Sequence, residues 1–170
     1  TKNATKACDF TTTGIKTNLK NLVGNTLWNT GTNGYTSASN GLASHFYSYE
    51  RSSNNGKICT SGTYCNDTVA RTTTWQGKIG LMYPSDYGYA TIGGTSMNRA
   101  SCLAKELYNW DGASDCRNND WLFDSSSWQW TLSPGAYSSY ANGVFLVNFA
   151  GFVYDDNAFF AGRVRPSVYL

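Results

Sequence analysis

The feature that most constrains how this chain can fold is a series of short, aromatic-rich segments that follow one another through its last third. They are WQWTLSP (128–134), GVFLVNFAGFVY (143–154) and RVRPSVYL (163–170). Turn residues such as Gly, Pro, Ser and Asn bound these segments, which is typical of antiparallel strands. The second segment predicts a hairpin that turns at Ala150-Gly151, and the third predicts a last strand.

Earlier parts of the chain contain shorter strand patterns. Alternating side chains predict a strand over 45–50, and a buried apolar run predicts another over 77–84. Pro84 is expected to end this second strand before a tight turn, because proline cannot donate a ladder hydrogen bond. A further strand is predicted over 118–123.

Two helices are predicted, one over 17–28 and one that is capped by Thr95 or Ser96 and runs to about Trp110. The apolar residues at helical spacing are Leu19, Leu22, Val23 and Leu27 in the first helix and Leu103, Leu107 and Trp110 in the second. Gly24 lowers the helix propensity of the first segment. The order of elements predicts an α+β fold in which two helices pack on a twisted antiparallel sheet with long irregular loops. Length favours one domain over residues 1–170.

Composition excludes several classes of protein. Charged residues make up 14% of the 170 residues, against roughly 25% in a typical soluble protein. A net charge of +2 and scattered Lys and Arg form no basic stripe, so nucleic acid is not an expected partner. The apolar runs are too short to cross a bilayer. With 41% hydrophobic and 15% aromatic residues, the chain has enough apolar surface for a core and is not intrinsically disordered.

Five cysteines suggest two short disulfides. We expect Cys59 to pair with Cys65 across a small loop and Cys102 to pair with Cys116, which would staple a helix to the loop after it. Their spacing matches no zinc pattern. Disulfides imply an oxidising compartment, outside the cytoplasm or at the cell surface. Cys8 is then left unpaired, joined to another chain, or separated from a partner lost by processing, since the chain begins without Met and is interpreted as a processed or excised piece.

The sequence offers no convincing catalytic constellation, and we expect a protein that is not an enzyme. Acidic residues are few, and Glu106 lies on a predicted helix beside Lys105, where a solvated carboxylate is the simpler interpretation. His45 is the only histidine, which leaves few bases to activate a nucleophile. Phosphate-loop, dinucleotide-binding, serine-hydrolase and zinc-protease motifs do not occur.

Residues 135–162 have the composition of a contact surface. Tyr and Phe are interspersed there with Ser, Asn, Gly, Ala and Asp, which combines rigid contact area with adaptable hydrogen bonding. Strand alternation predicts that Phe145, Val147 and Val153 face the core, together with Trp121 and Trp130 elsewhere, and that Leu146, Asn148, Phe152 and Tyr154 face outward. The predicted ligand-binding residues are Tyr137, Ser138, Ser139, Tyr140, Asn142, Asn148, Phe149, Phe152, Tyr154, Asp155, Asp156, Asn157 and Phe159. The alternative is that these aromatic residues are core and their loops are merely solvated.

One run of acidic residues leaves a metal alternative open. Asp155-Asp156-Asn157 supplies the oxygen atoms that Ca²⁺ prefers. Acidic residues of loops more often cap turns or face water, and the calcium motif of calcium-dependent lectins is missing. No cofactor is therefore expected, with Ca²⁺ as the alternative.

Several motifs carry a resemblance to a known family. The segments GKIGLMYPSDYGYA (77–90), NNDWLF (118–123), WTLSP (130–134) and VRPSVYL (164–170) resemble those of a paralogous family of bacterial surface or pilin-like proteins. The resemblance implies attachment to a pilus or cell surface through sequence that precedes this domain. More remotely, the chain is similar to the C-type-lectin fold of formylglycine-generating enzymes and retroelement-diversified ligand-binding proteins, with Arg165 in place of the terminal Arg of that fold.

In the diversified proteins the variable stretch lies just before the last strand and excludes Lys, Glu, Gln, Met and Trp. Residues 135–162 contain none of these five types. Low-charge hairpins are also poor in such residues, so diversification by a retroelement stays one of two explanations.

These observations predict an extracellular, surface-displayed binding domain, adhesin-like or receptor-like, that recognises a protein or glycan on another cell or host surface. One alternative is a calcium-dependent glycan lectin. The other is a structural pilin-like subunit without a specific ligand.

Overall fold

A computed structural model describes residues 16–29, 41–50, 74–111, 114–135 and 143–168, and shows a mixture of helices and mainly antiparallel strands, which confirms the α+β class. The helices are α2 (Thr17–Lys20), α3 (Ala43–Glu50), α4 (Pro84–Ala90), α5 (Arg99–Leu103), α6 (Ser114–Asn118) and the 3-10 helix η2 (Leu107–Asn109). The strands are β1 (Thr26–Asn29), β2 (Thr74–Gly77), β3 (Gly80–Leu81), β4 (Gln129–Pro134), β5 (Gly143–Val147), β6 (Val153–Asn157), β7 (Arg163–Val164) and β8 (Pro166–Ser167).

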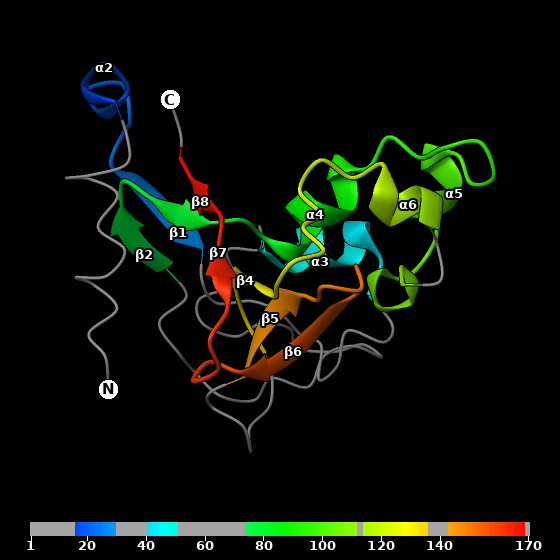
Figure 1. Ribbon diagram of the computed structural model, residues 1–170. Helices are drawn as coiled ribbons and strands as arrows, with labels where there is room; N and C mark the ends of the chain where they lie inside the picture. The colour runs from blue at the N-terminus through cyan, green and yellow to red at the C-terminus, as the bar shows by residue number, and fades with distance from the viewer. Residues whose placement is uncertain (1–15, 30–40, 51–73, 112–113, 136–142, 169–170) are drawn as a thin grey trace.

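The largest sheet has four strands in the order β6-β5-β4-β7 (Figure 1). Its β4-β5 and β5-β6 pairs are antiparallel, which confirms the predicted strand over 128–134 and the predicted hairpin over 143–154. Strand β7 pairs with β4 in parallel, and β8 then pairs with β3. The predicted last strand is thus two short strands separated at Arg165, where the chain passes from one sheet to another, and Pro166 begins the second of them.

The core lies between one face of this sheet and helices α3, α4, η2 and α6. Phe46 of α3 packs edge-on against Phe145 of β5, with ring centroids 5.3 Å apart. Tyr87 of α4 packs against Trp110 at 5.3 Å. All four rings are fully buried, and each such pair adds about 0.5–1.5 kcal/mol to the energy of burial.

The predicted disulfide between Cys102 and Cys116 is present and joins α5 to α6. Both cysteines are fully buried at the edge of the helical layer. Cys8, Cys59 and Cys65 lie outside the described residues.

The predicted helix over 17–28 is wrong beyond its first turn. Helix α2 ends at Lys20, and strand β1 takes the place of the second half. Trp28 decides this change, because its indole ring is buried over Gly80 and its Nε1 donates a hydrogen bond to the carbonyl of Gly77 at 2.9 Å. Pairing with β2 also provides hydrogen-bond partners for the backbone of β1, so tertiary packing overrides the helical pattern.

The predicted strand over 45–50 is also wrong, since these residues belong to helix α3. Ala43, Phe46 and Glu50 are buried, whereas Tyr47 is exposed, which is the pattern of a helix and not of a strand. Glu50 is held inside the protein by the amide and hydroxyl groups of Ser85, which donate to its carboxylate. The alternating aromatic residues concealed this helical pattern.

Pro84 begins helix α4 and does not end a strand. Proline suits the first helical position because the backbone nitrogen there makes no intrahelical hydrogen bond, so the missing N–H costs nothing. The backbone amide of Tyr83 donates to Asp86 at 2.8 Å, which caps the helix. The predicted strand over 77–84 is therefore reduced to the end of β2 and the two residues of β3.

The predicted helix from Thr95 or Ser96 to Trp110 is divided into α5 and η2. Asn98, and not Thr95 or Ser96, is the N-cap of α5, and its side chain accepts a hydrogen bond from the amide of Ser101 at 2.9 Å. The break precedes Leu107, whose amide donates instead to the carbonyl of Gly41. Leu107 and Trp110 are fully buried as expected.

In place of the predicted strand over 118–123, the structure has the end of α6, an isolated bridge at Asp120 and the turns around it. Asp120 accounts for the turn, because its Oδ1 accepts from the amide of Leu122 at 2.8 Å while its backbone bridges to Thr91. Trp121, predicted to be core, is 73% exposed. The same turn that buries Leu122 directs Trp121 outward.

Candidate functional site

The described residues of the predicted contact segment 135–162, from Gly143 onward, form the β5-β6 hairpin and the connection to β7. Tyr137, Ser138, Ser139, Tyr140 and Asn142 lie outside the described residues. The eight predicted ligand-binding residues that the structure describes occupy the turn, strand β6 and the connection after it.

The turn between β5 and β6 is built by Asn148, which is a structural residue and not an outward-facing one. Asn148 is 6% exposed, and its Oδ1 accepts from the amide of Ala150 at 2.8 Å. Gly151 follows with a φ of +97°, a conformation that L side chains rarely adopt. Asn148 is thus used to close the turn, and the prediction that it faces outward is wrong.

The helical layer holds this turn from behind. Arg117 Nη1 donates to the carbonyl of Ala150 at 2.5 Å, and the hydroxyl of Tyr87 donates to the carbonyl of Gly151 at 2.7 Å. Burial raises the pKa of Tyr87 well above its ordinary value, so this hydroxyl keeps its proton. Phe149, at the tip of the turn, is 52% exposed on this fixed support.

Strand register separates the two faces of the hairpin. Phe145 pairs with Asp155 and Val147 pairs with Val153, and side chains of paired residues lie on the same face. Phe145, Val147 and Val153 are fully buried, which confirms that this face points into the core. The other face carries Tyr154 and Asp156.

Leu146, predicted to face outward, is on that other face and yet fully buried. Its register partners are Trp130 on β4 and Tyr154 on β6, so it lies between two larger aromatic side chains. Strand alternation predicts the correct face for Leu146. It does not predict that side chains of the two neighbouring strands cover Leu146 on that face. Trp130, predicted to be core, is itself half-buried on this outer face.

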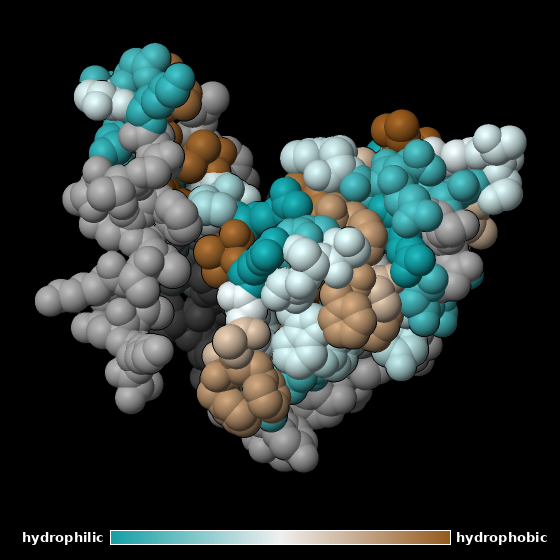
Figure 2. Space-filling view, viewed as in Figure 1, coloured by the Kyte–Doolittle hydropathy of each residue, from teal (hydrophilic) through white to brown (hydrophobic). Residues whose placement is uncertain are grey.

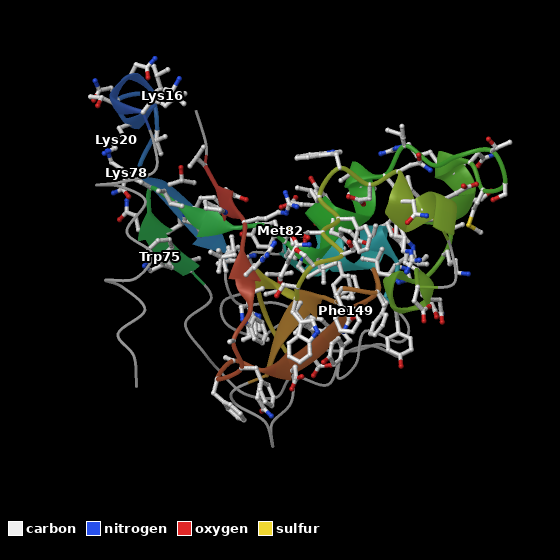
Figure 3. All side chains as sticks on the ribbon, in the orientation of Figure 1. Lys16, Lys20, Trp75, Lys78, Met82 and Phe149 are labelled. Atoms are coloured by element: carbon white, nitrogen blue, oxygen red, sulfur yellow. A yellow bond between two sulfur atoms is a disulfide. The ribbon has the colours of Figure 1, made fainter. Side chains whose placement is uncertain are left out.

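Aromatic rings form a continuous row from η2 to the edge strand β6. Tyr108 of η2 packs against Phe152, and Phe152 packs against Tyr154, with ring centroids 5.6 Å apart in both pairs. Phe152 and Tyr154 are half-buried, and Tyr108 is exposed. We refer to Tyr108, Phe152, Tyr154 and Trp130, together with the exposed Phe149 of the adjoining turn, as the aromatic face. Figure 2 shows tan and pale side chains gathered over β5 and β6, and Figure 3 labels Phe149 beside them.

A second group of rings lies beyond the end of β6. Phe159 and Phe160 pack at 4.5 Å, and Phe160 contacts Trp128 at 6.1 Å. Phe159 is 71% exposed, as its polar surroundings predicted. These rings extend the exposed aromatic surface along the connection from β6 to β7.

The acidic residues of β6 serve local structure. The hydroxyl of Tyr154 donates to Asp156 Oδ2 at 2.8 Å, and Asp156 Oδ1 accepts from the amide of Asn157 at 2.7 Å. Burial, reinforced by the hydrogen bond to Asp156, raises the pKa of Tyr154 to about 12. Burial likewise raises the pKa of Asp155 above its ordinary range, with the nearby charge of Asp156 adding to the shift.

This arrangement does not favour the calcium alternative. Consecutive strand residues point to opposite faces, so Asp155 and Asp156 cannot converge on one ion while β6 keeps its geometry. Over the described ranges, no three His, Cys, Asp or Glu residues are grouped so that they could hold a metal.

Sequence reasoning did not find Tyr108 or Trp130 as parts of the surface. The pattern predicts Tyr108 within a continuous helix and Trp130 in the core. The pairing of β4 with β5 and the position of η2 beside β6 bring them to the aromatic face. Among the helices that the structure describes, none has the length and apolar character needed to cross a membrane. Comparisons with models of protein families, with curated protein sequences and with solved structures found no match to this chain.

Proposed function

We propose that this protein is a ligand-binding domain of C-type-lectin-like architecture, displayed at a cell surface, and that its contact surface is the aromatic face. The observation that carries the proposal is the row of contacting rings of Tyr108, Phe152 and Tyr154, which runs from the exposed Tyr108 of η2 to the edge strand β6. A surface row of rings supplies apolar contact area with few rotatable bonds, which suits recognition. The proposed ligand is a protein or a glycan on another cell or host surface.

The construction of the site supports binding by a preformed surface. The turn that carries Phe149 is tied to the helical layer by Arg117 and Tyr87. Tyr154 is held by its hydrogen bond to Asp156. Side chains that are already ordered lose little conformational entropy when a ligand arrives. The proposed domain binds its ligand without transforming it and without a metal.

Two observations support placement outside the cytoplasm. The disulfide between Cys102 and Cys116 suits an oxidising compartment. The resemblance of several motifs to those of pilin-like surface proteins adds the proposal that the domain is carried by a pilus or another structure of a bacterial surface.

A screen on glycan and surface-protein arrays, run with and without EDTA, tests the proposal. We expect hits that persist in EDTA and are lost when Tyr108, Phe149 and Phe152 are all replaced by Ala. The matched control is Trp75→Ala, which removes an exposed ring from β2, outside the aromatic face. This control should keep every hit.

Each other result has a defined meaning. Hits that need calcium would replace the proposal with the lectin alternative. Hits that survive the triple substitution would show that the ligand binds elsewhere. An absence of hits with the folded protein would favour the structural subunit.

A further inference from the structure

A pocket of about 570 Å³ lies between α4, the turn at 121–122 and strand β8, and no residue of the segment 135–162 lines it. Apolar side chains that include Met82 and Leu122 form part of its wall, and Figure 3 labels Met82. Its polar groups come from Asp86, Arg165 and Ser167. A mainly apolar cavity with a few polar groups is the usual form of a site for a small ligand or a single anchoring side chain.

Arg165 is the cation of this pocket and is held in place from inside the protein. Its Nε donates to Oε1 of Gln129 at 2.5 Å, and Gln129 is 1% exposed. Within the part of the chain that the structure describes, the two terminal nitrogens of Arg165 have no hydrogen-bond acceptor. A guanidinium group with both terminal nitrogens available is suited to a bidentate bond with a carboxylate.

Aromatic rings border the same pocket. Trp121 is 73% exposed, and Tyr89 is 37% exposed. Tyr89 packs edge-on against Tyr47 at 6.0 Å, whereas Trp121 has no ring contact among the described residues. An exposed Trp at the edge of an apolar pocket gains buried area when a ligand covers it.

The charges of the pocket restrict the ligand further. Asp86 also lines the pocket, and the charge of Arg165 acts on the nearby Asp120, so the acidic side chains around this cation do not favour a dianion such as phosphate. Asp86 accepts the amide of Tyr83. Its negative charge favours a ligand that turns an N–H group toward Asp86 while its single carboxylate binds Arg165.

We propose that this pocket binds the carboxyl-terminal residue of a peptide chain whose last side chain is apolar. The carboxylate binds Arg165, the N–H of the last peptide bond is turned toward the negative charge of Asp86, and the side chain packs on Met82 and Leu122 beside Trp121. This site is separate from the aromatic face, and its ligand adds to the one proposed there.

Isothermal titration with matched ligands tests the chemistry. The probes are the peptide acetyl-Gly-Ser-Phe with a free carboxylate, the same peptide as a carboxamide, and free phenylalanine. We expect the carboxamide to bind at least about tenfold more weakly, because it loses charge-assisted hydrogen bonds to Arg165. Equal binding of acid and amide, or no binding of the acid at about millimolar concentration, would overturn the proposal. Free phenylalanine binding as tightly as the peptide would replace the peptide terminus with a free amino acid.

Two variants test the residues. Trp121→Ala removes a largely exposed ring and should leave the melting temperature unchanged while weakening the acid peptide about tenfold. Arg165→Lys keeps the positive charge but not the bidentate geometry, and should remove most of the preference for acid over amide. Trp75→Ala is the control, because Trp75 is an exposed Trp of β2 that does not line the pocket (Figure 3). If Trp121→Ala and Trp75→Ala bind the peptide alike, the proposal is wrong.

Discussion

Strands β5 and β6 belong to one hairpin but have opposite surroundings. Phe145, Leu146 and Val147 of β5 are all fully buried, whereas only Val153 of β6 is, and the four residues after it are partly exposed. Strand β5 has a neighbour on each side, and β6 lies at the edge of the sheet. The comparison teaches that the two strands of one hairpin can divide between scaffold and surface, since β5 (GVFLV) is apolar and central whereas β6 (VYDDN) is more polar and lies at the edge.

The largest expected effect comes from the scaffold strand. Phe145→Ala should lower the free energy of unfolding by about 3–5 kcal/mol, because it leaves a cavity beside Phe46. Phe149→Ala, the same change in the same hairpin at a half-exposed site, should cost less than about 1 kcal/mol. Denaturant unfolding of both variants measures the difference, and similar losses would remove the distinction between the two strands.

Removing the disulfide extends the comparison to the helical layer behind β5. Replacing Cys102 and Cys116 together by Ser should cost about 3 kcal/mol in the chain-entropy model, given their separation of 14 residues. The aromatic face should keep its ligand below the lowered melting temperature. Loss of binding at temperatures where circular dichroism shows a folded protein would mean that the face depends directly on the disulfide.

The stability of the scaffold should also depend on pH, because Asp120 is buried in it. Burial raises the pKa of Asp120 to about 7, despite backbone hydrogen bonds and Arg165, which lower it. An unfolded Asp titrates near about 3.9, so the folded protein binds the extra proton between about pH 4 and 7. Stability contributed by this residue therefore falls as pH rises through that range and is constant above it.

Asp120→Asn should accordingly melt about 2–6 °C above the parent protein at pH 7.5 and at nearly the same temperature at pH 4. Differential scanning calorimetry across this range makes the measurement. A constant difference between the two proteins at every pH would show that Asp120 has an ordinary pKa.

The smallest expected effect is on the surface strand. Tyr154→Phe removes only the hydroxyl that binds Asp156, at a half-buried site, and should change the free energy of unfolding by no more than about 1 kcal/mol. Binding through the aromatic face should weaken little, because the ring remains. A large loss of stability would place Tyr154 with the scaffold.

Where local pattern and tertiary packing agree, the sequence was sufficient. The hairpin, the strand before it, the burial of Phe145, Val147 and Val153, and the pairing of Cys102 with Cys116 were all predicted. In each case a two-residue period, a turn or a short cysteine spacing carries the information locally. That these residues form a single domain stays a prediction.

The failures share one physical cause, which is contact with distant parts of the chain. Trp28 becomes a strand residue because Gly80 makes room for its ring. Leu146 is buried because Trp130 and Tyr154 flank it. Trp121 is exposed because the backbone of Asp120 bridges to the distant Thr91 and fixes the turn that follows. The periodicity of the local sequence cannot identify these partners, because the tertiary fold brings them together.

Strand β8 has a consequence for the kinetics of folding. Its pairing of Ser167 with Gly80 joins residues about half the chain apart, while β7 joins the same segment to β4. Closing so long a loop is entropically costly, and contacts of this kind slow the search for the native state. The two sheets should thus be connected late in folding. Substitutions in β8 should accordingly accelerate unfolding more than they retard refolding.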